Sequence, residues 1–181
     1  MPHKYTIPAL DDESADRLIE LLQERLTATL DLHLTLKHAH WNVVGPNFIG
    51  VHEMIDPQVD LVRAQSDQIA ERIATLGGSP VGTPGFIVKT RSWEDYSIGR
   101  ELVPGHLAAL DLVYDGVITD HRAAVEETEE LDPVTQDMLI GHLAELELFQ
   151  WFVRAHLENA GGELRHEGAT TEQEAAEAAT E

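Results

Sequence analysis

The chain has 181 residues, of which 43% are hydrophobic, which suits one packed domain rather than two full cores. It has no Cys, and this excludes disulfides, thiol nucleophiles and Cys-ligated metal clusters. Its 12 Lys and Arg residues stand against 33 Asp and Glu residues, giving a formal net charge of -21. Such an acidic surface repels nucleic-acid phosphates and attracts cations.

The sequence gives no sign of a membrane protein or an exported one. No apolar run approaches the roughly 18 residues that a membrane span needs. Residues 1–10 lack the apolar centre of a signal peptide, so we expect a cytoplasmic location.

Two long helices are predicted in the first half of the chain, from apolar residues that recur every three or four positions. The first spans about residues 12–44 and ends at Gly45-Pro46. The second spans about residues 47–76 and stops at Gly77-Gly78. The turn between them is short, so we expect an antiparallel pair.

The second half predicts another antiparallel pair. A third helix covers about residues 104–131. The fourth starts with Asp132 as its cap and Pro133 in its first turn, a favoured combination, and closes near residue 161. No convincing strand is visible in the pattern.

The connection over residues 77–103 is long, and residues 92–95 read as a short extra helix within it. Four helices with one long crossover predict an all-α, ferritin-like four-helix bundle. We expect an N-terminal arm at residues 1–11, the bundle at residues 12–161 and an acidic, flexible tail at residues 162–181.

Five polar residues on the first two helices are candidate metal ligands: His40, His52, Asp56, Asp67 and Glu71. His52 and Asp56 are four residues apart, as are Asp67 and Glu71, so each pair shares a helix face. Imidazole and carboxylate together suit iron, and they also admit zinc or manganese.

The spacing of these ligands predicts a site shared between subunits. His40 and His52 flank the turn at similar heights and can form a cluster with Asp56. His52 and Asp67 are separated by about 22 Å of helix, so they cannot hold one ion within one chain. Two second helices that lie antiparallel about a two-fold axis would bring the two groups together.

Simpler interpretations of the same residues stay open. The pairs can be ordinary surface pairs, with Arg72 as a salt-bridge partner of the acids. His40 can be a hydrogen-bonded core histidine. Pro57 disfavours helical geometry at Asp56, which makes Asp56 the least secure ligand.

Other polar and aromatic positions have weaker signals. The only Glu-x-x-His match, Glu163 to His166, lies beyond the bundle and is interpreted as chance. His33 and His121 fall on apolar stripes, where a buried, hydrogen-bonded histidine is favoured over a secondary metal site. Trp151 is predicted to lie in the core.

Three segments carry a resemblance to a known family: HAHWNVVGPNFI at residues 38–49, HEMID at residues 52–56 and DQIAER at residues 67–72. Together they resemble the signature of the Dps mini-ferritins, and the acidity suggests a version from a halophilic archaeon. The resemblance implies a shell of twelve subunits that oxidises Fe(II), with hydrogen peroxide preferred, and stores ferric mineral. This activity would protect DNA from Fenton damage.

The resemblance also implies where the iron chemistry occurs. Ferroxidase centres would lie at two-fold dimer interfaces, with iron held at the positions matching His40, His52, Asp56, Asp67 and Glu71. Acidic pores for iron entry would form near the junction of the third and fourth helices, where the candidates are Glu126, Glu130 and Asp137.

Three other functions compete with the ferroxidase hypothesis. A DNA-coating nucleoid protein is disfavoured, because the only basic residues near the N-terminus are His3 and Lys4 and the tail is acidic. A di-iron oxidase that works within one bundle would need Glu-x-x-His pairs in its helices. A zinc or manganese site with a purely structural role would use the same candidate ligands, and it would show no oxidation of Fe(II).

Overall fold

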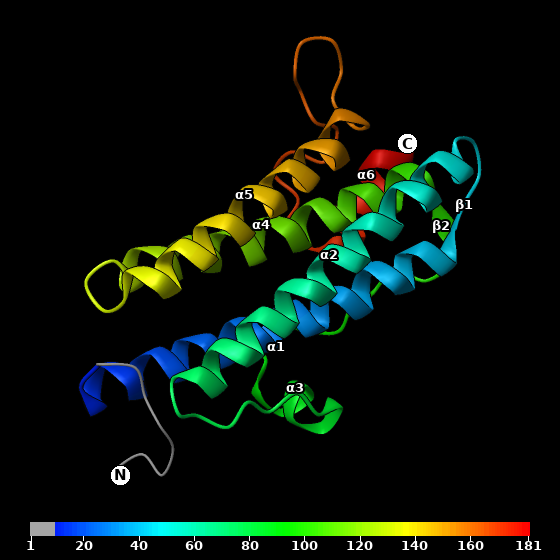
Figure 1. The fold of residues 1–181 in the computed structure, drawn as a ribbon. Coiled ribbons are helices and arrows are strands. Elements are labelled where there is room, and N and C mark those ends of the chain that lie inside the picture. The colour runs from blue at the N-terminus through cyan, green and yellow to red at the C-terminus, as the bar shows by residue number, and fades with distance from the viewer. Residues whose placement is uncertain (1–9) are drawn as a thin grey trace.

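Four long helices form two antiparallel hairpins that pack into a bundle (Figure 1). The structure, a computed structural model, describes residues 10–181, so most of the predicted N-terminal arm lies outside the described residues. The predicted all-α four-helix bundle with one long crossover is confirmed. None of the described helices has the length and apolarity needed to cross a membrane. The four bundle helices are α1 (Asp12–Asn42), α2 (Phe48–Thr75), α4 (Val103–Thr128) and α5 (Pro133–Ala155).

The turn between α1 and α2 is tight and depends on left-handed backbone conformations. Gly45 has a φ of 94° and Asn47 a φ of 63°, values that favour glycine and tolerate asparagine. A Cβ added at Gly45 would lie 2.8 Å from Leu102, so the turn also needs a residue without a side chain. This turn brings the last residues of α1 beside the first residues of α2.

Two clusters of buried apolar side chains hold the bundle together. One, near the α1–α2 turn, includes Leu36 and Ile55, and the other, near the opposite end, includes Leu22 and Ile73. Fully burying such a side chain contributes about 1.5–3 kcal/mol, so these stripes fix which faces of α1 and α2 point inward.

The fourth long helix begins as the sequence predicts. Asp132 accepts hydrogen bonds from the backbone N–H groups of Val134 and Thr135, and Pro133 occupies the first turn of α5. This cap satisfies two donors that the helix itself leaves unpaired.

The extra helix of the crossover lies earlier in the chain than predicted. Helix α3 spans Pro84–Thr90, whereas residues 92–95 form no helix. Pro84 suits the first turn of a helix. The side chains of the predicted segment serve tertiary contacts instead: Trp93 Nε1 donates to Asp31 Oδ2 at 2.5 Å, and Asp95 pairs with Arg91.

Two very short strands, which the sequence pattern did not predict, lie directly after α1 and at the end of the crossover. Strand β1 (Val43–Val44) pairs in parallel with β2 (Glu101–Leu102), with Val43 opposite Glu101 and Val44 opposite Leu102. A two-residue strand is too short to produce an alternating pattern, so periodicity could not reveal it. The pair ties the end of α1 to the crossover.

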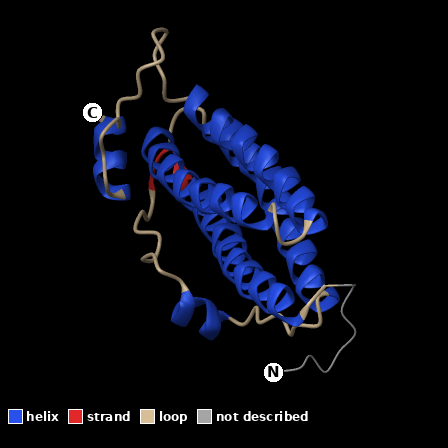
Figure 2. Cartoon of the chain, turned by 90° about the vertical axis from the view of Figure 1, so that its left-hand side faces the viewer, coloured by secondary structure: helices blue, strands red, loops and turns tan. Residues whose placement is uncertain are grey.

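The prediction of a flexible tail is wrong for the C-terminal segment. Residues Glu172–Thr180 form helix α6, which packs beside α4 at the end of the bundle that carries the strands (Figure 2). Thr171 and Glu174 form a capping box, and Ala175, Ala176 and Ala179 are buried. The small apolar face of alanines, hidden in a Glu-rich segment, supplies the packing that composition alone did not indicate.

Candidate metal centre

His40 and His52 face each other across the α1–α2 hairpin. The Nδ1 atom of His40 lies 3.0 Å from the carbonyl oxygen of His52, and the Nδ1 atom of His52 lies 2.9 Å from the carbonyl oxygen of His40. The two rings are stacked with centroids 3.6 Å apart. The predicted meeting of these two histidines at the turn therefore occurs within one chain.

These hydrogen bonds fix the protonation of both rings. A carbonyl oxygen can only accept, so each Nδ1 must carry the proton and donate. Each Nε2 then carries the lone pair, which is the form that binds a metal ion. Burial also lowers the pKa of His40, opposed in part by the hydrogen bond to His52, and so favours the neutral ring. His40 is therefore both a hydrogen-bonded, buried histidine and a possible ligand.

Asp56 joins the histidine pair, as the spacing predicts. Its Oδ1 atom lies 3.4 Å from His40 Nδ1. Helix α2 continues through Pro57, so Asp56 keeps a helical position in spite of the proline that follows it. The spacing of Asp56 relative to His52 along the helix is thus preserved.

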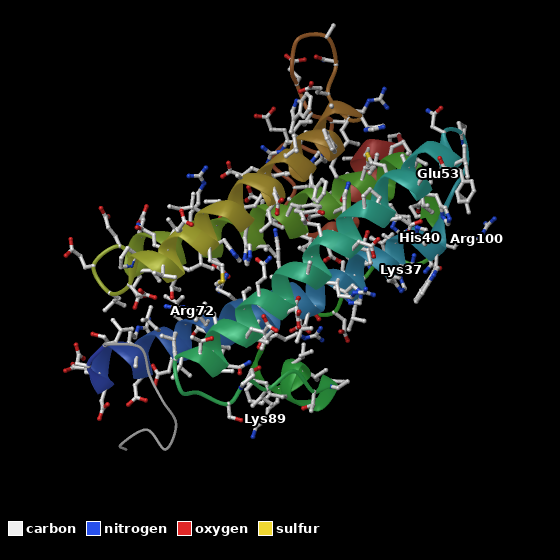
Figure 3. The ribbon with its side chains drawn as sticks, viewed as in Figure 1. Lys37, His40, Glu53, Arg72, Lys89 and Arg100 are labelled. Atoms are coloured by element: carbon white, nitrogen blue, oxygen red, sulfur yellow. The ribbon has the colours of Figure 1, made fainter. Side chains whose placement is uncertain are left out.

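Lys37 is a member of this cluster that the sequence analysis missed. Its Nζ atom lies 2.8 Å from Asp56 Oδ1, and this hydrogen bond holds the pKa of Asp56 below its usual value. The signal was present in the sequence, because Lys37 and His40 are three residues apart on one helix face. Figure 3 shows Lys37 and His40 at the same end of the bundle.

The two acidic candidates lie far along α2 from the histidine pair. Asp67 and Glu71 are exposed and one turn apart. Because α2 is continuous, the expected separation of about 22 Å between His52 and Asp67 applies. Within residues 10–181 of this one chain, no three His, Asp or Glu side chains converge on a point that could hold a metal ion.

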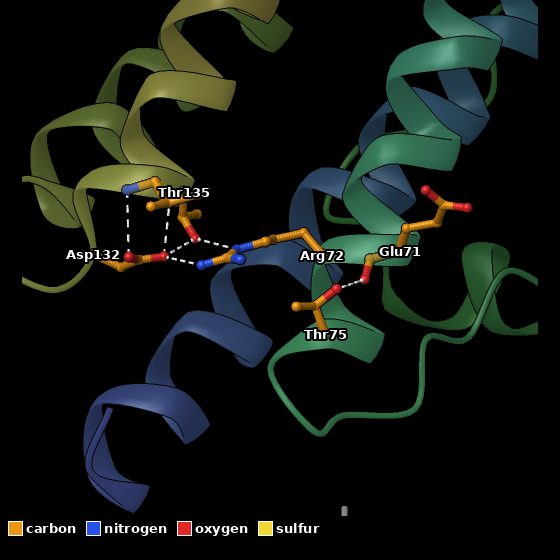
Figure 4. A network of polar contacts seen from close by, with 6 residues as sticks. Glu71, Arg72, Thr75, Asp132 and Thr135 are labelled. Atoms are coloured by element: carbon orange, nitrogen blue, oxygen red, sulfur yellow. Dashed lines mark hydrogen bonds and ion pairs between the residues drawn. The ribbon is translucent and has the colours of Figure 1, made fainter. Parts of the chain in front are cut away.

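Arg72 does not form the salt bridge with Asp67 or Glu71 that an ordinary surface pairing would give. Its guanidinium pairs with Asp132 and donates from Nε to Thr135 Oγ1 at 3.0 Å (Figure 4). The carboxylate of Glu71 points to the other side of α2 in the same view. Burial opposes ionisation of Asp132, but hydrogen bonds from Thr135 and Arg72 outweigh it and hold its pKa below the usual value.

An exposed apolar surface borders the histidine pair. Trp41 is 70% exposed and Ile49 is 59% exposed, and the ring of Phe48 lies 5.0 Å from that of His52. Trp41 is therefore not a core aromatic of this chain. Exposed apolar groups of this size are typical of interaction sites, and these residues lie near the candidate ligands in the sequence, with Phe48 in contact with His52.

The other expectations about single residues have mixed outcomes. Trp151 is 59% exposed on α5 rather than part of the core. In the Glu163–His166 match, His166 is buried and its Nε2 atom lies 2.9 Å from Asp111 Oδ2, whereas Glu163 is exposed. The three acids near the α4–α5 junction are exposed in the single chain: Glu126, Glu130 and Asp137.

His121 is buried but lacks the predicted hydrogen bond. Neither of its ring nitrogens has a hydrogen-bond partner among the described residues. Its ring centroid lies 6.1 Å from that of His142, which reaches Gln68 through Nε2 at 2.7 Å. Burial lowers the pKa of His121 to about 3 and that of His142 to about 4. His33 is half-buried, and burial is also the main reason that its pKa is lowered.

Comparison with known proteins agrees with this architecture. The family described as "Ferritin-like domain" matches residues 19–161, which cover the bundle. The fold and this match define a ferritin-like protein.

Closer relatives identify the branch of that class. The chain is 65% identical to the DNA protection during starvation protein of Mycolicibacterium smegmatis, over 97% of this chain and 96% of the relative. A solved structure of Mycobacterium smegmatis Dps superposes with a TM-score of 0.91 at 66% identity, covering 92% of this chain and 95% of the other. DpsA14 from Streptomyces coelicolor gives a TM-score of 0.87 at 64% identity, covering 89% and 96%. The chain belongs to the Dps family.

The comparisons correct one expectation about origin. Nothing in them supports a halophilic archaeal source. The chain has a net charge of -21, and it is 65% identical to a protein of Mycolicibacterium and 64% identical to one of Streptomyces. The acidity is therefore no guide to habitat here.

Proposed function

We propose that this protein oxidises Fe(II) at sites shared between two subunits and stores the ferric product inside a hollow oligomer of twelve chains, in the cytoplasm. The observation that carries the proposal is the pair of hydrogen bonds that His40 on α1 and His52 on α2 make through Nδ1, which leaves both Nε2 atoms free to bind metal. Helix α2 presents Asp67 and Glu71 far from this pair, in its second half. Neither half is a metal site alone, and a two-fold axis would complete both.

The ligands divide the work between two iron ions. Asp67 and Glu71 of one subunit, with His52 supplied by the other, would hold the tighter iron. His40 and Asp56 would hold a second, weaker iron or a water. Carboxylates stabilise Fe(III) more than Fe(II), because the extra charge favours hard oxygen ligands, and this preference drives oxidation.

Hydrogen peroxide is the proposed oxidant. Two Fe(II) ions give one electron each to one peroxide molecule, whose O–O bond breaks to yield two hydroxide ions. Pairing the irons delivers both electrons together, so no hydroxyl radical is released. Protection of DNA, which the names of the relatives describe, would then come from removing iron and peroxide.

Iron would enter through acidic pores. Glu126, Glu130 and Asp137 are exposed around the α4–α5 junction. A ring of such carboxylates raises the local concentration of cations. These pores would lie at three-fold axes of the proposed shell.

A direct test uses the assembled protein. Fe(II) is added without oxygen, then hydrogen peroxide, while ferric absorbance is followed in wild type and in His52→Ala and Asp67→Ala variants. We expect each variant to lose most of the rate. A crystal soaked in Fe(II) should show anomalous scattering from metal that contacts two chains; metal bound by one chain only would overturn the proposal.

A gel-shift at low and high salt distinguishes the proposed function from a DNA-coating protein. The proposed function predicts no retarded DNA, because a net charge of -21 repels phosphates. Strong retardation together with negligible iron oxidation would favour the alternative.

A further inference from the structure

A short part of the crossover, residues 96–102, separates α6 from the last turn of α1. This part, here called the crossover strip, makes hydrogen bonds to both helices. It lies at the end of the bundle that carries the strands (Figure 2). The strip thus connects the C-terminal helix with the segment that carries His40.

On one side the strip is held by α6. The backbone N–H and the hydroxyl of Ser97 both donate to Glu172 Oε2, at 2.6 Å and 2.8 Å. The next residue, Ile98, is buried against Ala176 and Ala109. A charged acceptor with two donors makes hydrogen bonds roughly twice as strong as neutral ones.

On the other side the strip holds the end of α1. His38 Nε2 lies 2.9 Å from the carbonyl oxygen of Ile98, to which it donates. Asn42 Nδ2 in turn donates to the carbonyl oxygen of His38 at 2.8 Å. Strand β1, directly after α1, pairs with the last two residues of the strip. His40 lies between these attachment points.

We propose that Glu172 is a positioning residue for the candidate iron site, acting through Ser97 and the crossover strip on the segment that carries His40. This inference rests on the proposed function. The Nδ1 atoms of His40 and His52 must keep their hydrogen bonds to each other's carbonyl oxygens for both Nε2 lone pairs to stay free, and these bonds need an ordered end of α1. Helix ends fray readily unless they are held, and the strip holds this one.

The test compares three variants of the full chain. Glu172→Ala removes the acceptor from Ser97, Glu172→Gln keeps an oxygen acceptor, and Glu177→Ala removes the same charge from an exposed position of α6. Hydrogen exchange of the amides at residues 38–44 is measured alongside zinc binding and iron oxidation. For Glu172→Ala we expect exchange about tenfold faster, and zinc binding weaker by a similar factor.

The pattern across variants separates positioning from general damage. Glu177→Ala should match wild type, and Glu172→Gln should recover most of the protection. Unchanged exchange at residues 38–44 in Glu172→Ala would overturn the inference. If Glu172→Ala does not fold, Ser97→Ala, which removes only the hydroxyl donor, decides by the same measurement.

Failure of the inference can be told apart from failure of the proposed function. Wild type that neither binds zinc nor oxidises iron contradicts the proposed function, whatever the exchange data. Wild type that oxidises iron, with Glu172→Ala equal to it in rate, zinc binding and exchange, contradicts only the role of Glu172.

Discussion

Lys37 Nζ lies 2.8 Å from Asp56 Oδ1, so the carboxylate of this candidate ligand is already paired with an ammonium group. A cation that binds Asp56 must compete with this ion pair. In the proposed site, this competition would make the second iron position weaker than the first.

Removing that competitor should strengthen the weaker position. We expect Lys37→Met to raise the affinity for a second zinc ion about two- to fivefold, the range that exposed ion pairs support. The pKa of Asp56 should rise toward its ordinary value, because the Lys37 hydrogen bond is the main cause of its depression. Calorimetric titration with zinc measures the affinity. Lys89→Met, on the distant α3, is the matched control, and an equal gain there would refute the explanation.

Arg72 should matter for stability rather than for metal binding. Its ion pair with Asp132 is largely buried and joins α2 to the first turn of α5. Breaking such a pair costs about 3–5 kcal/mol, because it leaves an uncompensated charge. Arg72→Ala should therefore lower the free energy of unfolding by about 3 kcal/mol in a denaturant titration at fixed protein concentration. A large change in zinc affinity without lost stability would contradict this assignment.

The buried histidines predict a loss of stability in mild acid. His121 and His142 have folded-state pKa values of about 3 and about 4, below the unfolded value near 6.5. Between these limits the unfolded chain binds more protons, so stability is full above pH 6.5 and falls as the pH drops. Each histidine should cost about 2 kcal/mol at pH 5 relative to pH 8.

A variant separates this effect from general acid sensitivity. His121→Leu should remove one histidine's share of the pH dependence, measured by denaturant unfolding at several pH values. His156→Gln, at an exposed position, should leave the slope unchanged. A slope in His121→Leu equal to that of wild type would contradict the prediction.

The apolar surface beside the histidine pair should be an interface between subunits. Ile49→Glu places a charge there, so we expect both smaller assemblies in sedimentation and a loss of most iron oxidation. Ala123→Glu adds the same charge at another exposed position, on α4, and should leave both measurements near wild type. Full oxidation by dissociated Ile49→Glu chains would contradict a shared site.

Helix periodicity predicted the bundle well, because its leucine stripes are long and regular. The meeting of His40 with His52 followed from their similar distances to the Gly45 turn. The role of Lys37 and the turning of Arg72 toward Asp132 were missed, since both depend on which of several nearby partners a long side chain selects. That choice is made by tertiary packing, which spacing alone does not encode.

The remaining errors have a similar cause. Helix α6 escaped notice because three alanines carry its buried face, and alanine is a weak hydrophobic signal in a Glu-rich segment. Helix α3 was misplaced because Ser92 resembles a cap, although Trp93 is engaged by Asp31. The two-residue strands are below the length at which any pattern can be read.

The crossed hydrogen bonds between His40 and His52 have a consequence for the order of events. Both imidazoles are in the tautomer that binds metal before any metal is present, so iron binding at Nε2 would release no proton from either ring. Under the proposed function, the acid released during mineral growth would then come from water bound to ferric ions. Filling of the shell would therefore acidify its interior, while the imidazole rings of His40 and His52 would keep their protonation state.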